Sequence, residues 1–363
     1  MPQRRPSTRQ KRSKPLPRKD TARRGGVAEP LEVEIEFLPG LEPFLKAELQ
    51  RLPGSVRIFG GSEDALRLGY SGRPRDLHRL RTATAVFRRH TFAVPRPKAL
   101  MGHQVFQELL AFLDEVRQEA DFGSFRFDAA GRESSTFLRL GEELERATGM
   151  RFDPEEGELL MRLRPRGEEA WEMLARTTPR PLSARPWRVR NMSGGLNAAV
   201  AVAMLRMAGV RPTDRVLNAM CGSGTLLVER ALMGEAERIV GVDIDPEALE
   251  MARENLAAAK RQGQVELRLE DATALADREG SYDVIVADVP WGDAIGEHAA
   301  NAQLYRDFLE EAWRVGSKAV RLVVLTHELR LFEGILEASR WRLDREVQVF
   351  HGGHRPKMYL LRK

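Results

Sequence analysis

The chain has 363 residues, a length that suits two or three domains, each large enough to bury its own core. The hydrophobic fraction of 42% is ordinary for a globular protein, and no apolar run approaches the roughly 18 residues needed to cross a bilayer, which argues against a membrane role. The single cysteine, Cys221, excludes an internal disulfide and metal sites built on paired cysteines. No apolar stretch follows the basic N-terminus, so we expect a cytoplasmic protein rather than an exported one.

The net charge of +5 is concentrated at the N-terminus. Residues 1–29 hold ten basic and two acidic residues and few apolar ones, so we expect a disordered basic tail there. Without that segment the net charge falls from +5 to −3, and any RNA-binding surface on the remaining chain must be a local patch. The tail is either a solvated extension or an arm that binds phosphates without sequence specificity.

Two small α+β units are expected before residue 179. In the first, residues 30–95, the alternating LEVEIEF predicts a strand, LEPFLKAELQRL predicts a helix, and short strands follow at 56–59 and 65–70. The second unit, residues 96–178, mixes helices and strands again, at 103–119, 124–129, 136–148, 158–166 and 170–177. The proline-rich stretch that follows stiffens the chain and breaks secondary structure, so residues 179–190 are predicted to be a linker.

Strands and helices alternate in residues 191–363, which predicts an α/β domain with a doubly wound, mostly parallel sheet. Only the short HGGHRPK segment separates the last two strands, too little for a parallel crossover, so the final strand should run antiparallel. Seven strands are expected, near residues 215–218, 238–242, 265–269, 282–287, 319–326, 343–350 and 358–362.

The segment RVLNAMCGSGTLLVE predicts a strand, a loop with Gly222 and Gly224, and a helix that begins near Thr225. Glycines at this place let the backbone approach a ligand, and the helix N-terminus offers free N–H groups. Leu227 occupies the third glycine position of GxGxxG, which argues against a dinucleotide, and there is no GxxxxGK loop. Asp243 ends the second strand, where its carboxylate can accept both ribose hydroxyls. Adenosine without phosphate, as in S-adenosylmethionine, fits this pattern best.

Asp271 follows the third strand in LEDATAL. Its carboxylate could accept from the adenine amino group while the Ala272 N–H donates to a ring nitrogen, although such an aspartate commonly serves only as a helix cap or turn residue. We favour the binding role because of the two preceding motifs. Further cofactor contacts are expected from neighbouring loop and strand-end residues, namely Asn218, Met220, Cys221, Ile244 and Asp288. Cys221 itself has no base beside it and is expected to pack rather than to act as a nucleophile.

The fourth strand ends in VIVADVPWGD, at the sheet edge where ligands bind in such folds. The Asp288 carboxylate and the Val289 carbonyl could accept the N–H bonds of an exocyclic amine and stabilise the positive charge that develops on methylation. Pro290 would fix the loop, and Trp291 would offer a flat face for a base extruded from its stack. The alternative is a strand end with a capping aspartate and a packing tryptophan.

These residues resemble the fourth motif of amino-methyltransferases, and LPGLEPFLKAEL, LHRLRTATAVFR and PLSARPW resemble the THUMP-containing RNA guanine-N2 methyltransferases. The resemblance implies a ferredoxin-like domain at 30–95, a THUMP domain at 96–178 and a Rossmann-like, seven-stranded class I methyltransferase domain at 191–363. It also implies S-adenosylmethionine as cofactor, the acceptor end and stem of tRNA as substrate, and a guanine N2 as target. No metal, membrane or obligate protein partner is expected.

The resemblance further implies that Gly194, Gly195 and Asn197 help line the cofactor site. It makes several basic residues of the N-terminal units candidates for phosphate contacts, namely Arg79, Arg81, Arg88, Arg89, Arg126, Arg132 and Arg139. A metal site is not expected at His351 and His354, which have no acidic or thiol companions nearby in sequence.

Two departures from the family pattern bear on activity. Asn218 and Ala219 stand where the family has Asp and Pro, which replaces a charged partner for the cofactor's amino group by an amide. Val289 replaces the first proline of the fourth motif. A catalytically silent RNA-binding homologue is therefore one alternative. A 23S or 16S ribosomal RNA guanine-N2 methyltransferase is a second alternative.

Overall fold

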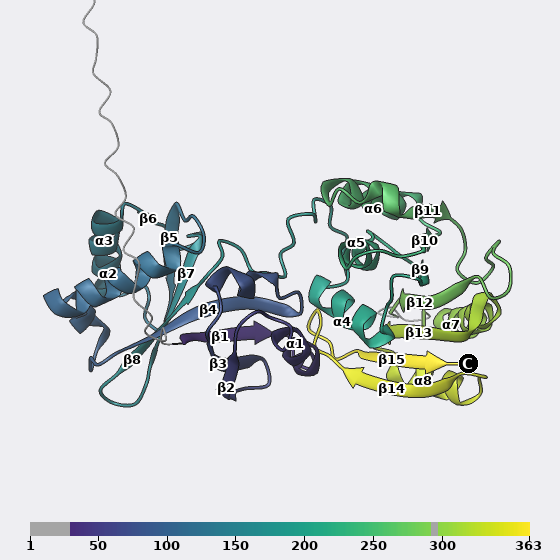
Figure 1. Cartoon of the computed structure of the whole chain (residues 1–363), viewed down its shortest axis with the longest axis horizontal. Helices are drawn as coiled ribbons and strands as arrows, with labels where there is room; N and C mark the ends of the chain where they lie inside the picture. The colour runs from purple at the N-terminus through teal and green to yellow at the C-terminus, as the bar shows by residue number, and fades with distance from the viewer. Residues whose placement is uncertain (1–29, 292–296) are drawn as a thin grey trace, which may run out of the picture.

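The computed structural model describes residues 30–291 and 297–363, and these form two lobes, each built on its own sheet (Figure 1). The basic tail predicted at residues 1–29 lies outside the described residues. Among the helices that the structure does describe, none is both long and apolar enough to cross a membrane.

The N-terminal lobe holds an eight-stranded sheet with the order β2-β3-β1-β4-β8-β7-β5-β6. Every helix and strand expected in this part of the chain is present, with shifts of a few residues at the ends. Strand β6 and the short 3-10 helix η2 were not expected, while the 3-10 helix η1 lies where Leu77 and Leu80 have helical spacing. The elements are β1 Leu31–Phe37, α1 Glu42–Leu49, β2 Val56–Gly61, β3 Ala65–Tyr70, η1 Pro74–Arg79, β4 Ala83–Phe92, η2 Pro97–Met101, α2 His103–Arg117, β5 Ser124–Asp128, α3 Ser135–Thr148, β6 Arg151–Phe152, β7 Leu159–Pro165 and β8 Trp171–Arg176.

The sheet is continuous across the domain boundary expected at residue 95. Strand β4 pairs antiparallel with β1 on one side and with β8 on the other, so hydrogen bonds join the two predicted units. β4 is ten residues long, and apart from Thr84, His90 and Thr91 its residues are buried. A buried strand between two neighbours makes one structural lobe of the two units, even though each has its own helices.

The C-terminal lobe has the predicted seven strands in the order β11-β10-β9-β12-β13-β15-β14. β15 pairs antiparallel with both β13 and β14, while the strands from β11 to β13 pair in parallel, so the expected reversal of the last strand is confirmed. The elements are α4 Ala198–Ala208, β9 Arg215–Ala219, α5 Thr225–Leu232, β10 Arg238–Asp243, α6 Pro246–Ala258, η3 Gln262–Gln264, β11 Glu266–Leu269, β12 Tyr282–Asp288, α7 Glu297–Val315, β13 Gly316–Thr326, α8 Leu329–Glu337, β14 Arg342–Gln348 and β15 Lys357–Arg362.

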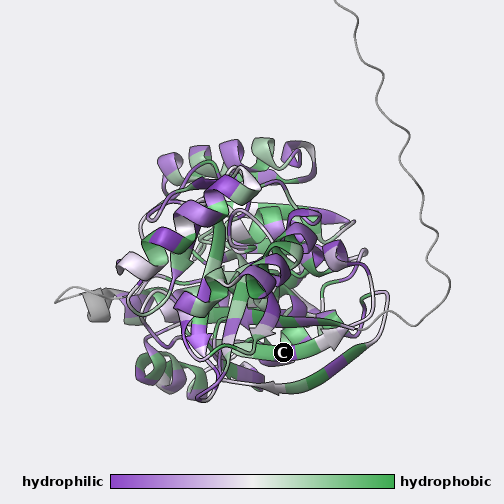
Figure 2. Ribbon diagram, turned by 90° about the vertical axis from the view of Figure 1, so that its left-hand side faces the viewer, coloured by the Kyte–Doolittle hydropathy of each residue, from purple (hydrophilic) through white to green (hydrophobic). Residues whose placement is uncertain are grey.

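Helix α4 joins the two lobes. It is apolar on nearly all sides, and only Arg206 of its eleven residues is not buried, as expected for a helix enclosed within a protein. Met204 belongs to one hydrophobic cluster with Phe44 of the N-terminal lobe and Met358 of the C-terminal sheet. Hydrophobic residues follow the central strands while the outer helices carry hydrophilic ones (Figure 2). The lobes thus share a core and sit in a fixed arrangement.

Three of the arginines expected to meet phosphates serve the fold instead. Arg88 and Arg89 are each only 7% exposed. Arg88 pairs with Glu115 and Glu119 and Arg89 with Glu172, while Arg81 reaches the fully buried Glu229 of α5. Sequence could not separate these residues from solvated arginines because their partners lie 27 to 148 positions away. The exposed candidates are Arg79, Arg132 and Arg139.

Candidate active site

A cavity of about 470 Å³ opens at the carboxyl edge of the C-terminal sheet. It lies where β9, β10 and β12 end, which is where ligands bind in doubly wound folds. Thirteen of the residues expected at the site line it: Asn218, Met220, Cys221, Gly222, Thr225, Asp243, Ile244, Asp271, Ala272, Asp288, Val289, Pro290 and Trp291. The structure therefore brings the cofactor loop and the fourth-strand motif to one place.

The loop after β9 is shaped by residues with left-handed backbone. Met220, Gly222 and Gly224 have φ of 53°, 53° and 80°, a region that favours glycine. A Cβ on Gly224 would lie 2.9 Å from the Cβ of Ala252, so this glycine lets α5 pack against α6 rather than lining the cavity. Gly222 does line the cavity and presents its backbone there.

Asp243 ties this loop to the end of β10. Its Oδ2 accepts a hydrogen bond of 2.8 Å from the Gly222 N–H, and its Oδ1 accepts one of 3.0 Å from the Asp245 N–H. A carboxylate has about four lone-pair sites, so acceptor capacity remains for a ligand. The aspartate expected to meet the ribose is thus held in place by the loop after β9.

Two acidic residues that follow β11, Glu270 and Asp271, also line the cavity, and the sequence predicted a binding role for Asp271 alone. Asp271 Oδ1 accepts from the Thr273 N–H at 2.8 Å and from its hydroxyl at 2.7 Å, which is the turn role weighed against binding. Its neighbour Glu270 also lines the cavity, with a buried Oε2 that has no hydrogen-bond partner. The pair of adjacent acids at the end of one strand could have signalled both residues.

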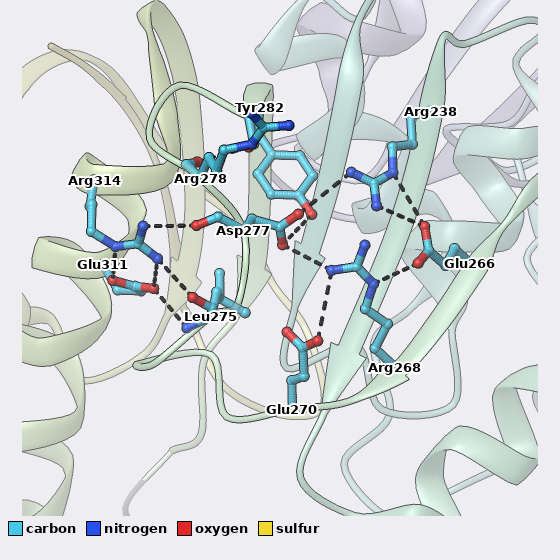
Figure 3. Close-up of polar contacts among 11 residues, drawn as sticks. Arg238, Glu266, Arg268, Glu270, Leu275, Asp277, Arg278, Tyr282, Glu311 and Arg314 are labelled. Atoms are coloured by element: carbon cyan, nitrogen blue, oxygen red, sulfur yellow. Dashed lines mark hydrogen bonds and ion pairs between the residues drawn. The ribbon is translucent and has the colours of Figure 1, made fainter.

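An ion-pair network that includes Glu270 fixes the loop after β11 (Figure 3). Asp277 Oδ2 accepts from Arg268 at 3.0 Å and from the Tyr282 hydroxyl at 2.8 Å. Arg314 of α7 donates to the carbonyls of Leu275 and Asp277, each at 2.8 Å. Burial, together with the neighbouring Asp277, raises the pKa of Tyr282, which therefore stays a hydrogen-bond donor. The loop is thereby tied to β11, β12 and α7.

Asn218 retains an acceptor despite the departure from the family pattern. Its Nδ2 donates to the carbonyls of Ala219 at 3.2 Å and Val286 at 3.1 Å. These bonds orient the amide so that the carbonyl oxygen Oδ1 is left buried and without a hydrogen-bond partner in a residue that lines the cavity. An amide oriented in this way can accept from a ligand ammonium group as an aspartate would, but without a formal charge.

Asp288 ends β12 beside the cavity. Burial raises the pKa of its carboxyl to about 7, against the opposing effect of a hydrogen bond from Trp291. Its Oδ1 is buried and has no hydrogen-bond partner. A carboxylate with a raised pKa and a free oxygen in a cavity is typical of a functional group. It can accept a hydrogen bond from a substrate and take up a proton near neutral pH.

The rest of the fourth-strand motif is held by backbone contacts. The Val289 N–H donates to the Leu325 carbonyl at 3.2 Å, and the Tyr305 hydroxyl donates to the Pro290 carbonyl at 2.6 Å. The Val289 side chain is 1% exposed and packs in the core of the lobe, which explains how valine can replace proline here. Trp291 is half-buried and lines the cavity.

The segment before α4 closes the cavity from the linker side. Gly194 and Gly195 line it as expected, and so do Met192, Ser193 and Leu196, which the sequence did not single out. Asn197 is not among the lining residues. Its Oδ1 accepts from the Ala199 N–H at 2.8 Å and caps α4.

The residues present fit S-adenosylmethionine. The described lining residues include Asp243, Glu270, Asp271 and Asp288 but no lysine or arginine, so the cavity suits a cationic ligand without phosphate. Three buried acceptors that line it lack partners: Asn218 Oδ1, Glu270 Oε2 and Asp288 Oδ1. Unpaired buried acceptors are costly, and a ligand rich in N–H and O–H donors would satisfy them. No group of three or more potential metal ligands occurs in residues 30–291 and 297–363.

Comparisons with known proteins agree with this chemistry. Residues 185–357 match a family model described as RMKL-like, methyltransferase domain. A tRNA (guanine(6)-N2)-methyltransferase of Thermus thermophilus is 32% identical, and the alignment spans 91% of this chain and 99% of that protein. The crystal structure of TrmN from Thermus thermophilus superposes with a TM-score of 0.73 at 28% identity, over 92% of this chain and 99% of the other.

A second solved structure extends the comparison of the fold. SMU.472, a putative methyltransferase complexed with SAH, superposes with a TM-score of 0.67 over 92% of this chain and 98% of that one. Its sequence identity is 16%, so the likeness shows a common fold.

Proposed function

The chain belongs to the tRNA (guanine(6)-N2)-methyltransferase family, and from that premise we propose that it methylates N2 of guanine 6 in tRNA. It is an S-adenosylmethionine-dependent methyltransferase, as its family and fold establish. The observation that carries the proposal is the acidic cavity at the sheet edge, where the partnerless Asp288 oxygen lies beside Trp291.

The cofactor would be held by residues on three strand ends. Asp243 would accept from the ribose hydroxyls, and Asn218 Oδ1 from the ammonium group of the methionine part. Asp271 and the Ala272 N–H would bind the adenine, and Glu270 adds an acceptor on that side. When bound, S-adenosylmethionine supplies an electrophilic methyl group on a sulfonium.

Asp288 would act on the target amine. The lone pair of an exocyclic amine is delocalised into the ring, and acceptors that hold its N–H bonds localise the lone pair toward the methyl group. Asp288 and the Val289 carbonyl would be these acceptors, since both residues line the cavity. The amine nitrogen would gain the methyl group that S-adenosylmethionine supplies and would then have to lose one proton. A carboxylate whose pKa is about 7 is suited to take it.

The N-terminal lobe would hold the tRNA by its acceptor end and stem. We propose a ferredoxin-like domain at 30–95 and a THUMP domain at 96–178, joined by the shared sheet and followed by the linker at 179–190. Arg79, Arg132 and Arg139 are exposed and available to phosphates. A cytoplasmic location belongs to the same proposal.

Methyl transfer to defined transcripts tests the proposed target. We expect the protein to transfer one or more methyl groups to a tRNA transcript with guanine at position 6, and mass spectrometry of the digested nucleosides to show N2-methylated guanosine. The matched control is the same transcript with adenine at position 6 and a compensating partner in the stem. Equal methylation of the control, or transfer only to ribosomal RNA, would contradict the proposal.

A further inference from the structure

Three imidazole rings surround the indole of Trp291. The ring centroids of His327, His351 and His354 lie 5.0, 5.9 and 5.7 Å from that of Trp291, and His327 and His354 are 4.9 Å apart. His327 follows β13, and the other two lie between β14 and β15. Among the described residues, no group of three or more potential ligands could hold a metal ion.

The HGGH sequence explains why two of the rings lie together. The His351 N–H donates to the His354 carbonyl and the His354 N–H to the His351 carbonyl, each at 3.0 Å. Gly352 and Gly353 have φ of 58° and 83°, which a two-residue hairpin of this kind requires. Residues opposite each other in a hairpin project to the same face of the ladder. Both imidazoles therefore contact one neighbour, the Trp291 ring.

The hairpin is held from behind by the N-terminal lobe. The Phe350 N–H donates to the Pro39 carbonyl of the N-terminal lobe at 3.0 Å. Within the hairpin, the Val349 N–H donates to the Pro356 carbonyl at 2.9 Å. Gly40, with φ of 92°, lies so close that a Cβ there would be 2.0 Å from the Gln348 carbonyl oxygen. The turn between β1 and α1 thus supports the base of the hairpin, which Figure 1 shows reaching toward α1. The two imidazoles sit on a rigid support.

The surroundings of His351 favour an uncharged imidazole that packs against Trp291. Burial lowers the pKa of His351, and the nearby Arg188 and His354 lower it further. A neutral His351 imidazole packs against an indole as another aromatic ring does. The rings of His351 and His354 meet that of Trp291 at steep interplanar angles of 82° and 76°.

We propose that His351 and His354 are positioning residues that hold the Trp291 ring in the orientation in which it stacks on the target base. The proposal rests on the proposed function, since it concerns the base that Asp288 and Trp291 receive. Trp291 lines the cavity while the imidazoles contact it from the hairpin. A ring already ordered by the protein loses less entropy when a base stacks on it, so binding and alignment improve together.

The test compares a variant that lacks the two imidazole rings of His351 and His354 with a variant that keeps an aromatic ring at both positions. The double variant H351A/H354A should lower kcat on the guanine-6 transcript at least tenfold, while the Kd for S-adenosylmethionine stays within about twofold of wild type. H351F/H354F, which keeps two flat rings without nitrogens, should restore at least half of the lost rate. The control variant H103A alters an exposed histidine of α2 and should leave both values unchanged. Wild-type turnover by the alanine variant, or equal loss in the phenylalanine variant, would overturn the proposal.

A spectroscopic readout separates positioning from general stability. With 2-aminopurine in place of the target guanine, stacking on Trp291 should change its fluorescence on binding, and W291A should remove that change. H351A/H354A should reduce it at an unchanged melting temperature, and a full wild-type response would overturn the proposal. If the double variant unfolds, H354A alone carries the same test, because that ring is exposed. Wild-type protein inactive on the guanine transcript would instead refute the proposed function itself.

Discussion

Glu48 of α1 accepts a hydrogen bond of 2.7 Å from Arg206 of α4, which joins the N-terminal lobe to the catalytic domain. The same carboxylate also accepts from the Arg81 and Thr82 N–H groups and from the Thr82 hydroxyl. Glu48 is only 6% exposed. One buried carboxylate therefore satisfies donors from two chain segments, residues 81–82 of its own lobe and Arg206 of α4.

Removing this carboxylate should destabilise the protein strongly. Glu48→Ala leaves the Arg206 charge and two backbone N–H groups without their acceptor, and breaking a buried pair in this way costs about 3–5 kcal/mol. We expect a clear fall in the urea midpoint of the transition that includes both lobes. Glu42→Ala is the matched control, because the Glu42–Lys46 pair lies on the surface of the same helix and should contribute less than about 1 kcal/mol. Equal midpoints for the two variants would contradict the role of Glu48.

Asp288→Asn should abolish methyl transfer while leaving the Kd for S-adenosylmethionine within about tenfold of wild type, because the amide cannot take up the proton. In the wild type, turnover should rise with pH through about 7, as the carboxyl ionises. Single-turnover assays between pH 5.5 and 9 measure both effects. A flat pH profile, or a variant that retains most of the wild-type rate, would remove Asp288 from the chemistry.

The raised pKa of Asp288 also predicts a stability effect of definite sign. An acid whose folded pKa of about 7 lies above its ordinary value of 3.8 destabilises the folded state as pH rises through that interval, and the penalty is complete above pH 7. Asp288→Asn should therefore melt at a higher temperature than wild type at pH 8, with the difference gone near pH 4. Thermal melts without cofactor measure this, and a variant less stable than wild type at pH 8 would refute it.

Restoring the family's usual acid at Asn218 should not improve the enzyme. Asn218→Asp removes the Nδ2 donor and sets a carboxylate oxygen near the carbonyls of Ala219 and Val286, which now accept at 3.2 and 3.1 Å. Because the site is 2% exposed, this repulsion should lower the melting temperature by several degrees. Calorimetric titration should show no gain in cofactor affinity. Tighter binding with unchanged stability would show that the amide orientation is not required.

Asp277 should influence cofactor binding from outside the cavity. Asp277→Ala removes the acceptor shared by Arg268 and the Tyr282 hydroxyl, and so loosens the loop that carries Asp271 (Figure 3). We expect the Kd for S-adenosylmethionine to rise several-fold with a smaller change in kcat at saturating cofactor. Asp344→Ala, which breaks a surface pair with Arg362, is the matched control. An unchanged Kd in Asp277→Ala would mean that the loop is held by Arg314 and by Glu311, whose Oε1 accepts from the Leu275 N–H at 2.7 Å.

The regular alternation of strand and helix patterns made the C-terminal fold predictable. Hydrophobic periodicity sets which segments form strands, and the brevity of HGGHRPK allowed only an antiparallel final strand. The glycines near 222–224, Asp243 and Asp288 were recognisable because each follows a strand that ends at the same sheet edge. Predictions from local patterns of this kind do not depend on contacts between residues far apart in the chain.

Two features could not be predicted from the sequence: that one sheet crosses the domain boundary expected at residue 95, and that several arginines are buried in ion pairs. β4 and β8 pair although about 80 residues separate them, and the local sequence of neither strand specifies which strand it pairs with. In the same way, Arg81 and Glu229 are 148 positions apart and belong to different lobes. Whether an arginine is exposed to phosphate or buried against a carboxylate depends on such pairings.

For the site itself, the sequence by itself determined the chemistry of the two strand-end motifs and the absence of a phosphate-binding loop, because these depend on residue types at short spacing. Only the tertiary structure decided the orientation of the Asn218 amide, the involvement of Glu270 and the segment at 192–196, and the gathering of three histidines around Trp291. Each of these rests on contacts between segments far apart in the chain, and such contacts are fixed by packing rather than by local pattern.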